Sequence, residues 1–326
     1  MGNPEGLHGS PADQRGLFAV LLGDGRPLLS FTGLSLILSG GFALFLALTR
    51  QFLPHDIQFL HMNADELCAL HDCRIVAFMV HDRAAFGGAL IAIGVLYMWL
   101  AEFPLRQRQA WSWWLFVISG ASGFGSFLAY LGYGYLDTWH GAATLLLLPV
   151  FLFGLVRSFH ILPSAGSLRA FARPVLPFTA KSPFDLGRIG FLMISLAMMV
   201  AGLVILTIGT TAVFVSEDLL FMELTPADLN AINPRLIPLI AHDRAGFGGA
   251  ILTTGVTVFG ILWFGRPARS LWQALLIAGC AGFGTAIGVH FFVGYKDIIH
   301  LVPAVLGAII FAGALAFTYR SMHVSV

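Results

Sequence analysis

The sequence predicts an all-α integral membrane protein with eight transmembrane helices, arranged as two tandem, parallel four-helix-bundle repeats. Three observations support this class. Of the 326 residues, 57% are hydrophobic and 11% are charged, whereas about 25% of the residues in a soluble globular domain are charged. Long apolar stretches recur along the chain, and a motif of the first half returns in the second half. A soluble core of this size could not bury so much apolar surface.

Apolar stretches of about 20 residues can cross a bilayer as helices. We expect eight such helices, over residues 31–49, 75–101, 112–132, 138–156, 189–215, 236–265, 272–293 and 299–318. The resulting division of the chain is an N-terminal tail over 1–30, a first bundle over 31–157, a linker over 158–188, a second bundle over 189–320 and a C-terminal tail over 321–326. The apolar patch at 17–22 is too short for a signal peptide.

Basic residues indicate the orientation, because cytoplasmic loops of membrane proteins are enriched in Lys and Arg. A cytoplasmic N-terminus places the basic linker and the C-terminus on the inside as well. Most tryptophans then lie near the cytoplasmic boundary, as interfacial anchors do. These are Trp99, Trp111, Trp113, Trp114, Trp263 and Trp272. We expect a multi-pass protein of the cell membrane, such as a bacterial inner membrane, with the lipid bilayer as partner. A net charge of +1 gives no basic excess for nucleic acid.

An internal repeat is visible in two motifs. The segment His81–Leu90 recurs as His242–Ile251, and the two copies differ only at their fifth and tenth positions. The pattern Gly-Tyr-x-Asp-x-x-His occurs at 134–140 and again at 294–300. The matching residues are about 160 positions apart, which indicates a duplication. Four helices per repeat is an even number, so the two repeats should cross the membrane in the same direction.

Ionisable residues inside apolar helices are rare and usually functional, because burying their charge in lipid is costly. Each copy of the first motif places a His-Asp-Arg triplet almost two turns inside a predicted helix. Each copy of the second motif places Asp and His on one face of the next even-numbered helix. The set is His81, Asp82, Arg83, Asp137, His140, His242, Asp243, Arg244, Asp297 and His300. In one interpretation the Asp and Arg residues form buried ion pairs that fix the helices, and in another the four histidines bind a ligand.

Small residues beside the histidines suggest what that ligand is. Alanine and glycine follow His81 and His242 at helical spacing, and they could leave a thin slot for a porphyrin with axial histidines. Arg83 and Arg244 would then meet the propionates. Close helix packing by small residues is the alternative explanation. A divalent metal ion held by two His and two Asp per bundle is the rival cofactor, since these are common metal ligands.

Two cysteines lie in the loop before the second predicted helix. Cys68 and Cys73 face an oxidising compartment if that loop is external, and they then form either a structural disulfide or a redox-active dithiol. The third cysteine, Cys280, falls within a predicted helix. The candidate catalytic residues are these two cysteines, Cys68 and Cys73, together with the intramembrane Asp82.

The pattern resembles the haem A synthase family, which is similar in having two four-helix bundles, histidines on the even-numbered helices and a cysteine pair in the first outer loop. The matching positions are His81, His140, His242, His300, Cys68 and Cys73. The resemblance implies haem b in the second bundle, and a second haem or a substrate beside the cysteines. The family has a Glu three residues before the second-helix histidine, where this chain has Phe78. That departure argues against the hydroxylating activity of the family.

These observations favour a haem-binding membrane oxidoreductase or electron carrier, with paired axial histidines in each bundle and a thiol–disulfide or quinone redox partner. The first alternative is an ion-coupled transporter that uses the intramembrane Asp, His and Arg residues. The second is a divalent-metal-binding membrane protein, and the third is a subunit whose polar pairs only fix helix packing. The sequence leaves open whether the protein is an enzyme. It contains no P-loop and no dinucleotide-binding fingerprint.

Overall fold

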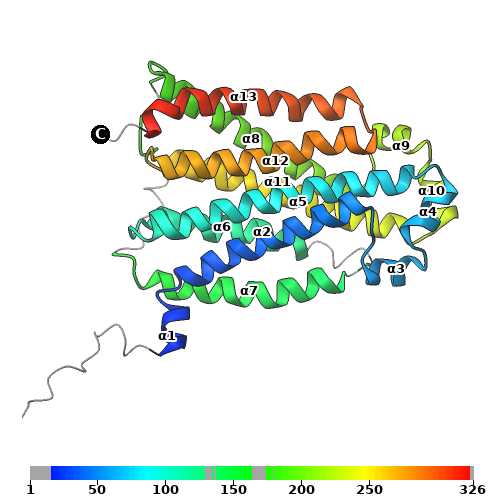
Figure 1. The fold of residues 1–326 in the computed structure, drawn as a ribbon, viewed down its shortest axis with the longest axis horizontal. Coiled ribbons are helices and arrows are strands. Elements are labelled where there is room, and N and C mark those ends of the chain that lie inside the picture. The colour runs from blue at the N-terminus through cyan, green and yellow to red at the C-terminus, as the bar shows by residue number, and fades with distance from the viewer. Residues whose placement is uncertain (1–15, 129–133, 136, 164–173, 178, 324–326) are drawn as a thin grey trace, which may run out of the picture.

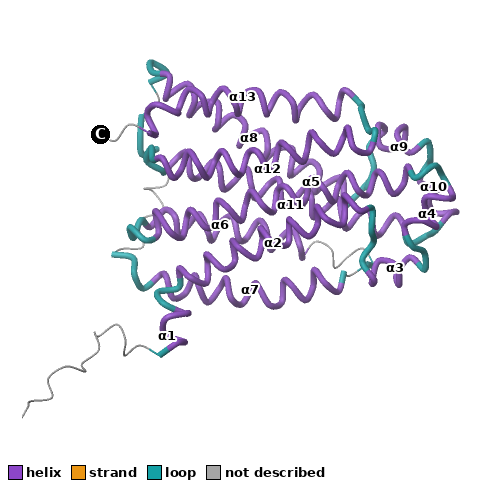
Figure 2. Tube along the Cα trace, viewed as in Figure 1, coloured by secondary structure: helices purple, strands orange, loops and turns teal. Residues whose placement is uncertain are grey.

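A computed structural model describes residues 16–128, 134–135, 137–163, 174–177 and 179–323, and every regular element in these ranges is helical (Figure 1). The long helices lie side by side along the longest axis of the molecule, and loops join them at the two ends (Figure 2). They are α2 (Arg26–Thr49), α5 (Arg74–Leu100), α6 (Ala110–Leu128), α7 (Thr138–Phe159), α8 (Pro183–Gly209), α11 (Leu236–Phe264), α12 (Arg269–Val293) and α13 (Ile298–His323). A short π-helical segment, η1 (Ala101–Leu105), extends α5.

Seven of the described helices are long and apolar enough to cross a membrane, with α5 and η1 counted together. The remaining long helix, α6, coincides with the third predicted span, whose last residues lie outside the described part of the chain. The predicted helix positions agree with the structure to within several residues. The differences are at the ends: α2 begins earlier than expected, α8 both begins and ends earlier, and α13 extends to His323. The described residues thus confirm the all-helical fold, and their long apolar helices are compatible with a multi-pass membrane protein.

Five short helices complete the described structure: α1 (Leu17–Leu22), α3 (Pro54–Leu60), α4 (Ala64–Leu70), α9 (Ser216–Met222) and α10 (Pro226–Ile232). The pair α3 and α4 precedes α5, and the pair α9 and α10 precedes α11. These four helices gather at one end of the molecule, whereas α1 and the C-terminus lie towards the other (Figure 1). Capping boxes begin α4 at Asn63 and Glu66 and α10 at Thr225 and Asp228, which satisfies backbone N–H groups that have no partner within the helix.

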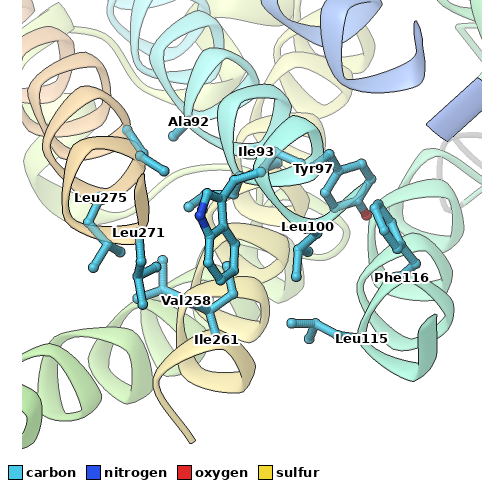
Figure 3. Packing of buried hydrophobic residues seen from close by; sticks show 14 of the residues in the cluster. Ala92, Ile93, Tyr97, Leu100, Leu115, Phe116, Val258, Ile261, Leu271 and Leu275 are labelled. Atoms are coloured by element: carbon cyan, nitrogen blue, oxygen red, sulfur yellow. The ribbon is translucent and has the colours of Figure 1, made fainter. Parts of the chain in front are cut away.

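The two halves of the chain pack extensively against each other. Within the halves, α2 packs on α5 and α8 packs on α11. Between the halves, α5 packs on α12, α11 packs on α6, and α5 also touches α11. At the end of the molecule remote from α3 and α9, side chains of these central helices form an apolar core (Figure 3). The four helices at the centre therefore come from both halves.

The glycine pairs of the repeated motif make these contacts possible. Gly87 lies against the backbone of Gly40 on α2, while Gly88 lies against Thr285 on α12. In the other half, Gly248 packs on the backbone of α8, and Gly249 packs on Ser126 of α6. A Cβ atom at any of these glycines would overlap its neighbour. The structure therefore assigns Gly88 and Gly249 to close helix packing, which was the alternative to a porphyrin slot.

Candidate functional site

Two buried arginines join the halves in a reciprocal way. Arg83 on α5 places its Nε 2.7 Å from Oδ2 of Asp243 on α11, and its Nη2 2.9 Å from Oδ2 of Asp56 on α3. Arg244 on α11 contacts Asp218 on α9, and its Nε lies 3.7 Å from Oδ2 of Asp82 on α5. Each arginine thus pairs with the motif aspartate of the other half. Buried ion pairs thus exist, but they join the two copies of the motif rather than the neighbours Asp82–Arg83 and Asp243–Arg244, and they connect α5 to α11.

Each arginine is also held by the short helix that precedes its own long helix. Asp56 accepts a hydrogen bond from the hydroxyl of Tyr135, and Asp218 accepts one from Tyr295 at 3.0 Å. Burial, reinforced by the neighbouring carboxylates, raises the pKa of both tyrosine hydroxyls above their ordinary value. Tyr135 and Tyr295 therefore remain protonated donors at neutral pH. Phe78, where the haem A synthase pattern has Glu, is buried. The Cζ atom of Arg244 lies over its ring, 5.1 Å from the ring centroid.

A cluster of possible metal ligands forms where α7 begins. Asp137 caps this helix, because its Oδ1 accepts hydrogen bonds from the backbone N–H groups of Trp139 and His140. Its Oδ2 lies 2.7 Å from Nδ1 of His140 and 3.7 Å from Nε2 of His242. The two histidines approach each other to 3.0 Å between these same nitrogens. One ligand atom from each of the three residues lies within 4.8 Å of the others, so a single ion could meet all three.

His55 on α3 is a further member of this cluster. Its Nε2 lies 2.7 Å from Oδ1 of Asp137 and 3.5 Å from Oδ1 of Asp56, with its side chain 10% exposed. Neither ring nitrogen has a hydrogen bond of acceptable geometry in the described residues. The ring therefore meets Asp137 as an ion-pair partner, and one ligand atom from each of His55, Asp56 and Asp137 lies within 4.8 Å of the others. Burial alone would raise the pKa of Asp137, but the neighbouring imidazoles of His140 and His242 outweigh it and hold this pKa well below its usual range.

A cavity of about 210 Å³ opens beside the cluster. Its polar end carries Arg83, Asp137, His140, His242 and Asp243. Its walls are apolar and come from α2, α5, α6 and α7. The candidate ligands thus lie at the boundary between a charged network and an apolar space.

The matching positions of the other half are arranged differently. His81 places Nδ1 3.0 Å from Oδ1 of Asp82 and Nε2 3.2 Å from Nε2 of His290. His300 lies within reach of the Tyr295 hydroxyl. Its Nδ1 is 3.6 Å from Asp297, a residue at the surface. Glu217 stands at the position that matches His55. Among the described residues, metal-ligand groups of three are found only around Asp137.

The histidines do not meet as we expected. We expected His81 to face His140, and His242 to face His300, within separate bundles. The structure instead brings together His140 with His242 and His81 with His290, and both pairs join the two halves. Two axial ligands of one iron would lie about 4 Å apart, since each metal–nitrogen bond is about 2 Å. The observed pairs are in direct contact, and both arginines are engaged by aspartates rather than free for propionates.

Cys68 and Cys73 form a disulfide between the end of α4 and the start of α5. The surrounding loop is tied to the region of α9 by two contacts. His71 Nε2 lies 2.7 Å from the Met222 carbonyl oxygen, and Arg74 pairs with Glu223 at 2.7 Å. The predicted disulfide is thus confirmed, and it lies beside an open pocket lined by Arg50, Asp72 and Phe221. Cys280 is a free, exposed cysteine.

Several residues of these networks were not singled out from the sequence. They are His55, Asp56, Tyr135, Asp218 and Tyr295. A signal was present for most of them: Asp56 and Asp218 are separated by nearly the same interval as the repeated motifs, and both tyrosines belong to the Gly-Tyr-x-Asp pattern. His55 has no histidine at its matching position, so the repeat could not reveal it. His290 also has no histidine at its matching position, and it lies against His81.

No protein-family model, curated protein or solved structure matches this chain. The assignment of a function therefore depends on the chemistry of the clustered residues themselves.

Proposed function

We propose that the protein is an integral membrane metalloprotein that holds one divalent transition-metal ion with Asp137, His140 and His242, and that His55 is the fourth ligand. The observation that carries the proposal is the convergence of these side chains, whose ligand atoms lie within 4.8 Å for the first three. His55 is supported as the fourth, because its ligand atom lies within 4.8 Å of those of Asp56 and Asp137. Small side-chain rotations would bring all four to the bond lengths of about 2.0–2.2 Å found at zinc sites.

The ligand set and the local charge both favour a cation. Imidazole ligands suit zinc, copper, iron and nickel, and a carboxylate is compatible with several of these ions. Three carboxylates lie in this region, those of Asp56, Asp137 and Asp243, and Arg83 pairs with the first and the last of them. With neutral histidines, the formal charge of the cluster is negative, so a bound divalent ion would balance it. The ligands would come from α3, α7 and α11, so the ion would also connect the two halves of the chain.

The membrane arrangement that we propose has eight spans, with α6 as the third, in two parallel repeats and with both termini in the cytoplasm of the cell. The reciprocal pairing of Arg83 and Arg244 supports the duplication, because matching residues make matching contacts. The basic linker between the repeats supports the orientation. In this arrangement the ion would lie near the outer ends of the spans.

Haem b, with an oxidoreductase or electron-carrier function, is a second candidate. The apolar cavity beside His140 and His242 favours it, because an apolar pocket with an axial histidine suits a porphyrin. It would require the contact between the two imidazoles to open. Ion-coupled transport is a third candidate, and it would require the ion pairs between α5 and α11 to exchange partners during each cycle.

Metal analysis and an absorption spectrum of the purified protein test the proposal. We expect about one transition-metal ion per chain after purification without chelators, and no Soret band. His140→Ala and His242→Ala should each lose the ion. His300→Ala is the matched control, because it changes the equivalent position of the other half, and it should retain the ion. A metal-free wild-type protein that takes up no added zinc, iron, manganese or copper would contradict the proposal, and a Soret band lost in His242→Ala would favour haem.

A further inference from the structure

We infer that the cavity beside the proposed metal ligands binds the ring of a lipid-soluble quinone that enters from the bilayer. The inference deepens the proposed function, since it names the molecule that the metal would meet. A reaction between the metal and the quinone would require the proposed metal site, whereas binding of the quinone to the cavity would not. It rests on three properties of the cavity: the composition of its walls, its position at the lipid-facing side of the molecule, and the charge of its polar end.

The walls of the cavity are aromatic and apolar. Phe42, Phe86, Phe124, Phe127 and Trp139 contribute rings from four helices, α2, α5, α6 and α7. Aromatic side chains bind a planar ring by offset-stacked or edge-to-face contacts, which adds to the effect of burying its area. A flat ring therefore fits these walls better than a flexible acyl chain alone.

The cavity lies where the protein would face lipid. Phe42 on α2 and Trp139 on α7 both line it, and both are also exposed at the surface, by 53% and 64%. These two helices pack on each other, but their apolar outer faces remain uncovered by the described residues. A molecule dissolved in the bilayer could therefore reach the cavity without crossing water, with its isoprenoid tail left among the lipid chains.

The polar end selects an uncharged head group. Asp137 and Asp243 present carboxylates there, and Arg83 is already bound by Asp56 and Asp243. A phosphate head group would meet negative charge with no free arginine to balance it. A quinone carbonyl needs only a hydrogen-bond donor, and the imidazoles of His140 and His242 can supply an N–H. The charge of the site thus favours a quinone over an anionic lipid.

Quenching of tryptophan fluorescence by decylubiquinone tests this inference on the detergent-solubilised, metal-free protein. Trp139 lines the cavity, whereas the other six of the seven tryptophans lie on the segments at the opposite end of the long helices. We expect saturable quenching with a dissociation constant in the micromolar range, and loss of the saturable part in Trp139→Phe. Thr144→Phe, which fills the cavity, should weaken binding at least tenfold. Leu145→Phe is the matched control, because Leu145 is 76% exposed on the same helix, and it should bind as the wild type does.

Three results would overturn the inference. The first is saturable quenching that persists in Trp139→Phe, the second is equal binding by Thr144→Phe and the wild type, and the third is displacement of decylubiquinone by dodecanol at similar concentrations, which would show that only the chain is recognised. Since the protein is metal-free here, a failure of quinone binding leaves the proposed metal site standing. A wild-type protein that binds quinone but no metal would leave this inference standing instead.

Discussion

Arg83 pairs with Asp243, the aspartate of the other copy of its own motif, rather than with the adjacent Asp82. The Nε–Oδ2 distance is 2.7 Å. Arg244 makes the equivalent pair with Asp82, with its Nε 3.7 Å from Oδ2. Burying a charge in an apolar surrounding is unfavourable unless an opposite charge compensates it. Each arginine also meets an aspartate of its own half, but each motif aspartate has its arginine partner in the other half.

Loss of one arginine should therefore destabilise the whole protein. Arg83→Met leaves the buried Asp56 and Asp243 without their cation, and breaking such a pair costs about 3–5 kcal/mol. Thermal unfolding in detergent measures the effect. Arg26→Met is the control, since its pair with Asp24 is partly exposed and should contribute at most about 1 kcal/mol. Equal stabilities of the two variants would contradict the role of Arg83.

The glycine of the motif can be tested by a compensating pair. Gly249→Ala places a methyl group against the side chain of Ser126, and overpacking of this kind costs about 1–3 kcal/mol. Adding Ser126→Gly should recover most of the lost stability. At Gly284, which has no neighbour within 4 Å, alanine should be neutral or stabilising by about 0.5–1 kcal/mol. If Gly249→Ala behaved like Gly284→Ala, α6 and α11 would not be as close as described.

The disulfide gives a third prediction. Cys68 and Cys73 close a loop with a sequence separation of 5, and the chain-entropy relation for so short a loop gives about 2 kcal/mol. Cys68→Ser should lower the unfolding temperature, and adding a reducing agent should not lower the unfolding temperature of this variant further. A maleimide should label only Cys280 in the native protein, and all three cysteines after reduction and unfolding. Labelling of Cys68 without a reductant would show that the pair is not oxidised.

Alkaline pH should weaken the fold through Tyr295. The folded-state pKa of this hydroxyl is raised, so the protonated tyrosine contributes stability that is complete below the unfolded pKa of about 10. As the pH rises above that value the unfolded chain ionises first, and stability is lost towards the higher folded pKa. The unfolding temperature should therefore fall between about pH 9.5 and 11, and Tyr295→Phe should reduce the slope. If the unfolding temperature of Tyr295→Phe fell with pH as steeply as that of the wild type, Tyr295 would not be the group responsible.

The positions of the helices could be predicted from the sequence more accurately than their packing partners. The position of the His-Asp-Arg triplets inside α5 and α11 followed from the apolar run before each triplet, and the Cys68–Cys73 bond followed from the position of its loop. Which helices pack together could not be predicted, because apolar periodicity does not distinguish α6 from α12 as the partner of α5. The pairs between Arg83 and Asp243 and between His140 and His242 depend on that choice. His55 lies in a seven-residue helix too short to recognise from its pattern.

The position of the metal ion is the central claim, and X-ray absorption at the edge of the bound metal tests it most directly. The expected spectrum has about four nitrogen and oxygen ligands at about 2.0–2.2 Å, with the outer-shell scattering of imidazole rings. That scattering should diminish in His140→Ala and stay the same in His300→Ala. A spectrum with porphyrin or sulfur ligands, or one unchanged in His140→Ala, would contradict the site at Asp137, His140 and His242.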